Sequence, residues 1–431
     1  MKKIFILILI LLNFTFLVNG QQDTSSNSKK VDTTILDKLK FSRVDNGLDL
    51  HTFELWNGDF GGFTTQSKTR EFYLGPIGVQ LTLFTEENNM WKNGKFSMFL
   101  LNTYGNNPTA KYLHDTQYFD NMEAPQAKHL TLSKNNIIEF RNFIYCLYYE
   151  HTFKNFRLLA GQYDINYDFA NSTTGFNFIN SSFGVSPAIT VNVPSFSTYP
   201  FTALAFRGEY NFNKFYFRSA ITEGSGGDQK INLHGDSYNF TEGEGVMILN
   251  EAEIRNVKND HWKSSYKVGV WNHTGHIFYD LTRPEDSLGK HPMVKGNSGL
   301  YLIADRVLRF EKQDSSQFLS GFVALDYVPG KQNFYNYSIG GGLSYTGLFK
   351  KRPEDVISIG AFCPFVNDKL VREQGFAKNE IEAEFNYNIK VNAFINLQPS
   401  FQYIYQPGAI VGSYNPVAFL LRCTVRNGLF N

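Results

Sequence analysis

Cysteine is scarce in this sequence of 431 residues. The three cysteines, Cys146, Cys363 and Cys423, are odd in number and lie far apart in the chain. A small secreted domain held by disulfides carries an even number of cysteines, and a structural zinc site carries them in close pairs. Neither arrangement is present, so the sequence predicts neither a disulfide framework nor a cysteine metal site.

A surplus of charge of either sign is also missing. The chain holds 41 Lys and Arg against 40 Asp and Glu, which gives a net charge of +1 with neutral histidines. Proteins that bind nucleic acids usually carry a basic patch or a run of Lys and Arg, and the sequence contains no such run. We therefore expect no nucleic acid among the partners of this protein.

Sequence motifs of enzymes are absent as well. The nine histidines are scattered, and His273 and His276 have no partner at a metal-ligand spacing. No nucleophile elbow and no HExxH sequence occurs. The glycine-rich residues 56–62 are not followed by Lys-Ser or Lys-Thr, as a phosphate-binding loop would be, and are interpreted as a turn or plug element. The sequence predicts no enzyme activity, no cofactor and no metal.

Long apolar runs are confined to the N-terminus. Lys2 and Lys3 precede an apolar stretch, and the small residue Gly20 follows it, which is the pattern of a secretory signal peptide over residues 1–20. A membrane anchor is the alternative, but a polar tract follows at once. Beyond it no stretch reaches the roughly 18 apolar residues of a membrane helix. The exported chain is then periplasmic, secreted or an outer-membrane barrel, and residues 21–70 are interpreted as a periplasmic leader.

Segments with two unlike faces dominate the rest of the chain. Over residues 380–389, apolar side chains alternate with acidic and amide side chains without a fault, so Ile381 and Phe385 share one face while Glu382 and Glu384 share the other. The pattern recurs in about fifteen segments of about ten residues, which is longer than the usual strand of a soluble sheet. Aromatic residues make up 16% of the chain. These features are typical of a membrane barrel, with lipid outside and water inside.

The sequence therefore predicts an all-β fold, a transmembrane antiparallel β-barrel of about 16 strands over residues 71–431. The last strand, residues 416–426, is expected to close the barrel against the first strand near Ile77. Long loops are predicted at residues 105–136, 164–200 and 224–245. The second of these is rich in aromatic and apolar residues, so we expect it to be ordered and to fold into the lumen.

Several runs of sequence, in order along the chain, resemble the same protein family. Four of them contain LLAGQYDINYDFANSTTGFNF from Leu158, KVGVWNHTG from Lys267, GGLSYTGLFKKRPEDVISIGAF from Gly341 and INLQPSFQYIYQPGA from Ile395. The chain resembles the carbohydrate-selective porins (OprB type) of Gram-negative outer membranes. The resemblance implies a sixteen-stranded barrel that passes monosaccharides such as glucose by facilitated diffusion, through a constriction lined with Arg and acidic residues. Two departures are the poorly matching residues 105–136 and the terminal Asn431, which follows the aromatic Phe430.

Charged residues expected on the lumen side are the candidates for contact with a sugar. Arginine offers a planar fork of donors, and carboxylates accept hydrogen bonds from vicinal hydroxyls. Mixed charges suit a neutral polyol better than a ring of one sign, which would select ions. The alternative is that such charges form cross-strand ion pairs that brace the wall, or cap loops through Asx bonds. The substrate-channel candidates are Arg207, Arg218, Arg255, Arg422, Glu251, Glu253, Glu382 and Glu384 on strands, and Asp164, Asn166 and Asp168 in the long insertion.

The predicted function is that of a porin in the outer membrane of a Gram-negative bacterium, exported through the N-terminal signal peptide. Its expected partners are carbohydrates, bound weakly and transiently, and outer-membrane lipids. A non-selective general porin, or a plugged barrel with a role in adhesion or assembly, is the alternative. The preferred sugar and the oligomeric state, monomer or trimer, stay open at this point.

Overall fold

The computed structural model describes residues 50–124, 128–133, 136–193, 196–226, 232–238, 240–258, 261–311 and 316–427. All of them belong to one compact unit, Ser42–Asn431. The predicted signal peptide, residues 1–20, and residues 21–49 of the predicted leader lie outside the described residues, as does Asn431.

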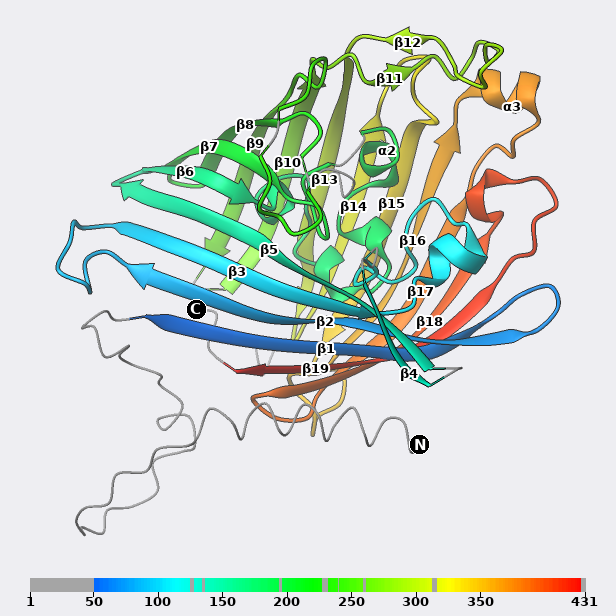
Figure 1. Ribbon diagram of the computed structural model, residues 1–431. Coiled ribbons are helices and arrows are strands. Elements are labelled where there is room, and N and C mark those ends of the chain that lie inside the picture. The colour runs from blue at the N-terminus through cyan, green and yellow to red at the C-terminus, as the bar shows by residue number, and fades with distance from the viewer. Residues whose placement is uncertain are drawn as a thin grey trace. The chain divides into compact units, whose positions relative to one another are not determined.

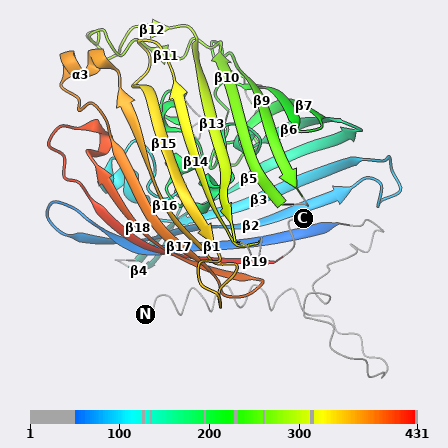
Figure 2. The ribbon, with the colours of Figure 1, turned by 180° about the vertical axis from the view of Figure 1, so that it is seen from behind.

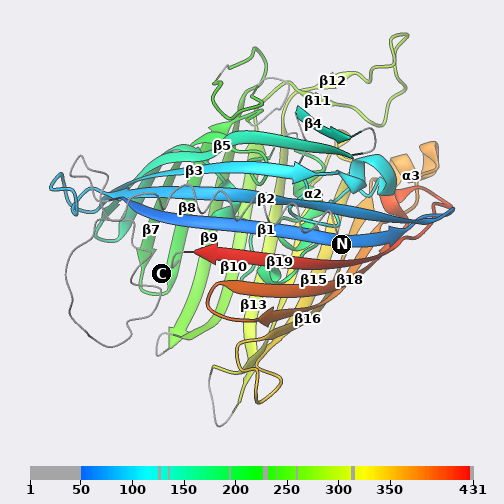
Figure 3. The same cartoon turned by 60° about the horizontal axis from the view of Figure 1, so that its bottom comes forward.

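A closed antiparallel barrel forms the wall of this unit (Figures 1 and 2). Each strand pairs with its neighbours, and β1 pairs with both β2 and β19, which closes the sheet (Figure 3). This confirms the predicted barrel and its strand number. The sixteen wall strands in the described part of the chain are β1 (His51–Thr64), β2 (Thr69–Phe84), β3 (Gly94–Gly105), β5 (Asn136–Phe153), β6 (Phe156–Tyr163), β7 (Ala203–Phe212), β8 (Phe215–Glu223), β9 (Val246–Lys258), β10 (His261–His273), β13 (Asn297–Phe310), β14 (Phe318–Tyr327), β15 (Tyr335–Thr346), β16 (Val356–Val366), β17 (Ile381–Lys390), β18 (Ile395–Tyr405) and β19 (Val417–Asn427).

Short elements occupy the loops. Strand β4 (Lys128–Ser133) pairs with β5 beyond the end of β3, and β11 (Phe278–Tyr279) pairs with β12 (Met293–Val294) in a two-stranded ribbon. The helical turns are η2 (Thr109–Leu113), η3 (Ile165–Tyr167), η4 (Gly175–Asn177), η5 (Ser181–Phe183), α2 (Pro187–Thr190), α3 (Asp368–Gln374) and η6 (Pro407–Ala409). Within the described ranges, every helix is too short or too polar to cross a membrane.

The barrel begins earlier in the chain than the sequence predicts. His51–Thr64 forms wall strand β1, so the assignment of residues 51–70 to the leader and of residues 56–62 to a turn or plug is wrong. The strand that contains Ile77 is β2, so β19 closes against β1 instead. Glycines hid this strand because they interrupt its alternation. One of them is needed for close approach: a Cβ at Gly61 would lie 2.2 Å from the backbone oxygen of Phe419 on β19.

The two faces of the wall differ as the alternation predicted. On β17, Phe385 is exposed on the outer face, whereas Glu382 and Glu384 are buried on the inner face. Exposed Phe206, Phe217 and other apolar residues continue the outer face around the wall. An outward apolar surface of this kind suits contact with lipid.

Two long loops fill much of the interior. The inner loop, residues 164–193 and 196–202, carries α2 into the barrel (Figure 1) and buries Phe178 and Phe183 against Phe322 and Phe362 of the wall. This confirms the predicted ordered insertion in the lumen. The second loop, residues 106–124, buries Phe119 beside Phe63 and Phe72. Within the long loop predicted at residues 105–136, residues 106–124 do not stay on the surface but pack inward, because Phe119 needs an apolar site. Lys128–Ser133 of the same range forms β4.

Candidate functional site

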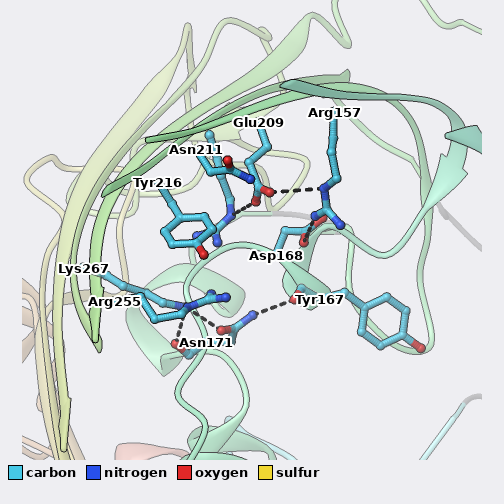
Figure 4. A pocket seen from close by; sticks show the side chains of 10 residues that line it. Arg157, Tyr167, Asp168, Asn171, Glu209, Asn211, Tyr216, Arg255 and Lys267 are labelled. Carbon is cyan, nitrogen blue, oxygen red and sulfur yellow. Dashed lines mark hydrogen bonds and ion pairs between the residues drawn. The ribbon is translucent and has the colours of Figure 1, made fainter. Parts of the chain in front are cut away.

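Two cavities inside the barrel share a lining residue, Tyr167 of the inner loop. The first, which we call the ionic pocket, has a volume of about 380 Å³ and is shown in Figure 4. It is lined by Arg157, Tyr167, Asp168, Asn171, Glu209, Asn211, Tyr216, Arg218, Arg255 and Lys267. The second, the aromatic chamber, has a volume of about 440 Å³. Six of the aromatic residues that line it are Tyr118, Tyr145, Tyr167, Phe176, Phe196 and Tyr199. Both volumes fall within the roughly 300–1,000 Å³ usual for small-molecule sites.

Strand register builds the wall of the ionic pocket. Arg157 on β6 stands opposite Glu209 on β7, Glu209 opposite Arg218 on β8, and Arg218 opposite Glu251 on β9. Directly opposite residues on neighbouring strands have adjacent side chains, so charges of alternating sign attract along this row. We call these four residues the charge row. The charge row supplies Arg157, Glu209 and Arg218 to the lining of the ionic pocket.

Short ion pairs hold the charge row together. Glu209 accepts from Arg218 Nε at 2.6 Å and contacts Arg157 Nε at 3.1 Å. Arg218 Nη1 lies 2.7 Å from carboxylate oxygens of both Glu251 and Glu253. Arg255 then donates to Glu253 through Nε at 2.8 Å and Nη2 at 2.9 Å. Charge-assisted and bidentate hydrogen bonds of this kind are among the strongest in proteins, so the wall side chains are well fixed.

The inner loop completes the ionic pocket from the other side. Asp168 lies 2.5 Å from Arg207 Nη2 and accepts from the Tyr163 hydroxyl at 2.9 Å. Burial opposes ionisation of Asp168, but the adjacent Arg207 guanidinium outweighs it and lowers the pKa of this carboxyl. Lys267 Nζ donates to the backbone oxygen of Asn171 at 2.9 Å and to its Oδ1 at 2.6 Å. These contacts dock the loop onto β7 and β10.

Few of these charges face the water of the pocket. Arg207 is fully buried, and the Glu209, Glu251 and Glu253 side chains are almost so. By contrast, the Arg157 and Arg255 side chains are 33% and 34% exposed. Arg255 stacks over the Tyr216 ring at 4.6 Å, which holds its donors toward the cavity. A solute in this pocket would therefore meet guanidinium donors and aromatic rings more readily than carboxylates.

The predicted candidates divide into two groups. The structure brings Arg207, Arg218, Arg255, Glu251, Glu253 and Asp168 together around the ionic pocket. The remaining candidates lie elsewhere in the lumen and hold loops. They are Arg422, Glu382, Glu384, Asp164 and Asn166. Two of them, Asp164 and Asn166, line the aromatic chamber.

Each residue of the second group has a visible structural role. Arg422 donates to Asp59 on β1 at 2.7 Å and to Asp120 of the second loop at 2.8 Å. Glu384 accepts from the backbone N–H groups of Ile179 at 3.0 Å and Asn180 at 2.7 Å, which fixes the inner loop to β17. Glu382 also accepts from the Asn180 side chain. These contacts match the bracing alternative stated for the candidates.

Asp164 and Asn166 belong to a capped turn. The Asp164 side chain accepts from Asn166 N at 2.9 Å, and the Tyr145 hydroxyl also donates to Asp164. Burial raises the pKa of Asp164 to about 7, although these hydrogen bonds act in the opposite direction. Asn166 donates to the backbone oxygens of Phe169 at 3.0 Å and Gly184 at 3.3 Å. Both residues shape the start of the inner loop.

Several pocket residues are not among the candidates that the sequence predicts. Glu209 and Arg157 follow from the same alternation as Arg207, and their opposite charges on adjacent strands were a usable signal. Lys267 required knowledge of which loop atoms would lie beside it. Tyr167 lies in an irregular turn, where no periodicity tells an exposed ring from a buried one. Among the described residues, no three His, Cys, Asp or Glu side chains are placed to hold a metal ion.

Comparison with known proteins gives one family. The profile of the family described as "Carbohydrate-selective porin, OprB family" matches residues 76–426. Porin B of Pseudomonas aeruginosa is 24% identical over 168 residues, an alignment that covers 34% of this chain and 37% of Porin B. This chain thus matches little more than a third of the length of that relative.

Solved structures support the same fold. The high-pH structure of Pseudomonas putida OprB superposes with a TM-score of 0.74 at 17% identity, covering 88% of this chain and 94% of that one. The low-pH structure of the same protein gives a TM-score of 0.55 at 14% identity, covering 88% of this chain and 92% of that one. The outer-membrane channel DcaP of Acinetobacter baumannii gives 0.51 at 13% identity, covering 89% of this chain and 99% of that one.

Proposed function

This chain belongs to the carbohydrate-selective porin family, OprB, and on that premise we propose that it lets monosaccharides such as glucose diffuse across the outer membrane through the ionic pocket. Passage is passive and needs neither cofactor nor energy coupling. Residues 1–20 serve as the export signal and residues 21–49 as a periplasmic leader. The partners are carbohydrates, held weakly, and the surrounding lipids.

The observation that carries this proposal is the pairing of charges around the ionic pocket. Four arginines, Arg157, Arg207, Arg218 and Arg255, each lie within 3.1 Å of a carboxylate, namely Glu209, Asp168, Glu251 and Glu253, which is close enough for mutual neutralisation. Lys267 is held by Asn171 instead. A nearly neutral wall gives ions little electrostatic advantage over an uncharged polyol. The donors that remain exposed can then bind sugar hydroxyls.

Weak binding is part of the mechanism. A porin must release its solute as readily as it takes it up, so each contact should be exchangeable with water. Arg157 and Arg255 meet this requirement because each guanidinium is partly exposed and already paired with a wall carboxylate. We expect a dissociation constant near the millimolar range, about −4 kcal/mol in binding free energy.

The test is liposome swelling with the full-length protein. Glucose, other monosaccharides and amino acids of similar size are compared for the parent and for the double variant Arg157→Ala plus Arg255→Ala. The parent should pass glucose faster than amino acids, and the double variant should lose this preference by several-fold. Arg372→Ala is the control, because Arg372 is an exposed arginine of α3 that lines neither cavity.

The outcomes separate the competing functions. Equal rates for all solutes in the parent would point to a general porin. Absence of swelling with properly folded protein would point to a plugged barrel with a role in adhesion or assembly. Loss of preference in the Arg372→Ala variant would remove the exposed arginines of the pocket from the explanation. Cross-linking of the folded protein in detergent would decide between monomer and trimer.

A further inference from the structure

The aromatic chamber and the ionic pocket lie in series along the barrel. The ionic pocket takes residues that adjoin short turns: Arg157 follows residues 154–155, and Asn211 and Tyr216 flank residues 213–214. The ionic pocket also takes Tyr167, Asp168 and Asn171 from the inner loop. The aromatic chamber takes residues from both long loops, such as Tyr118 and Tyr199. In outer-membrane barrels the short turns face the periplasm and the long loops face outward. A solute from outside therefore reaches the aromatic chamber first.

Tyr167 lines both cavities. The residue is 52% exposed, and its ring points away from Lys267 and Asn171 (Figure 4). It meets Tyr145 edge-on at 6.5 Å and Tyr163 at 5.9 Å between ring centroids. A side chain shared by the two cavities is in a position to contact a solute that moves from one to the other.

The backbone of Tyr167 is firmly held although its ring is exposed. It ends turn η3, which is capped by Asp164, and its carbonyl accepts from the Asn171 side chain at 3.0 Å. Asn171 is in turn bound by Lys267 of β10. The ring is thus mounted on a fixed turn, which limits the entropy that a bound solute would cost.

A second ring in the aromatic chamber is also left in water. Phe176 is 56% exposed and belongs to the same inner loop. Most apolar residues of this loop are buried against the wall, whereas Phe176 is not. Exposed aromatic groups inside a passage indicate a surface for a ligand with an apolar face. A pyranose ring has such a face, formed by its axial C–H groups.

We propose that the aromatic chamber is a separate carbohydrate site that precedes the ionic pocket, and that the Tyr167 ring determines specificity for cyclic sugars. The pyranose stacks its C–H face on the exposed rings while its hydroxyls stay hydrated. It then passes Tyr167 and exchanges water for the donors of Arg157 and Arg255. The inference rests on the proposed function, because it assigns an order and a ring-shape preference to the same sugar passage.

The experiment compares glucose with sorbitol in liposomes that hold the full-length protein. Both solutes have six carbons, but sorbitol is open-chain and lacks a ring face. The Tyr167→Ala variant should lose the glucose-over-sorbitol preference of the parent by about two- to tenfold, the range expected for one aromatic contact. Tyr167→Phe keeps the ring and should retain the preference. Phe176→Ala should show a smaller loss in the same direction.

Two controls keep the result interpretable. Tyr279→Ala removes an exposed tyrosine of β11 that lines neither cavity and should leave the preference unchanged. Tyr167→Leu restores apolar bulk without a ring, so it should lose the preference even if Tyr167→Ala folds poorly. An undiminished preference in Tyr167→Leu would overturn the inference. A parent that passes no sugar would instead overturn the proposed function, which separates the two failures.

Discussion

Two sectors of the lumen both carry inward charged side chains, but these side chains are accessible to water in only one of the sectors. Around β6–β10, arginines and carboxylates form the charge row, and two guanidinium groups stay accessible to water. On β17, Glu382 and Glu384 are also inward, but both are buried and accept hydrogen bonds from the inner loop. An inward charge therefore says little about contact with solute. Whether the charge is accessible to solute depends on whether another part of the chain covers and binds it.

The largest effect on stability is expected when the buried arginine beside the ionic pocket is removed. Arg207→Ala leaves the largely buried Asp168 without its main partner, and breaking a buried pair in this way costs at most about 3–5 kcal/mol. Urea unfolding in liposomes, followed by tryptophan fluorescence, should show this loss. A change in sugar selectivity without loss of stability would mean that Arg207 reaches the solute despite its burial.

The acidity of Asp164 offers a comparison by pH. Its pKa of about 7 in the folded chain exceeds the ordinary Asp value near 3.9, so the folded state binds the extra proton between these values. Stability should therefore fall as pH rises from about 4 to about 7, by at most about 4 kcal/mol, and should stay level above pH 7. Unfolding curves of the parent and Asp164→Asn check this. The variant should lack this component, and an identical pH profile would exclude Asp164 as its source.

Glu384 on β17 holds the inner loop, and its removal should have a smaller effect on stability. Glu384→Ala leaves the backbone N–H groups of Ile179 and Asn180 without their acceptor, which we expect to cost about 1–3 kcal/mol. The inner loop should become more sensitive to proteolysis and the ion conductance of the barrel should rise. Glu384→Gln keeps one acceptor oxygen and should lie between variant and parent. Equal protease resistance in all three proteins would show that the loop is held by its apolar contacts alone.

The smallest effect is expected when only the hydrogen-bond geometry at the pocket surface is changed and the charge is kept. Arg255→Lys keeps the charge but loses the two-pronged contact with Glu253, so we expect a loss of about 0.5–1 kcal/mol in sugar discrimination. Ion selectivity, measured as a reversal potential in planar bilayers, should stay the same because the net charge is unchanged. A shift in reversal potential with intact sugar preference would reverse this assignment.

Alternation of apolar and polar residues predicts most of the barrel. Side chains on a strand must point to opposite faces, so residues 380–389 already separate a lipid face from a lumen face. The same reasoning fails at β1, where glycines have no side chain to show a face. It also places Arg422 and Glu384 among the candidates. Alternation separates the lumen face from the lipid face, but it does not show which parts of the lumen are occupied by loops.

The sequence by itself determined the wall: the period of two, the aromatic outer face and the antiparallel order follow from local chemistry. The tertiary structure decided which inward charges remain accessible. That outcome depends on where the inner loop lands, and its contacts join residues more than a hundred positions apart, such as Asn180 and Glu384. It also depends on strand register, which placed Arg157, Glu209, Arg218 and Glu251 in one row. No local pattern encodes where the loop lands, or which residues of β6 and β9 stand beside the β7–β8 hairpin, because these contacts form only when distant parts of the chain come together.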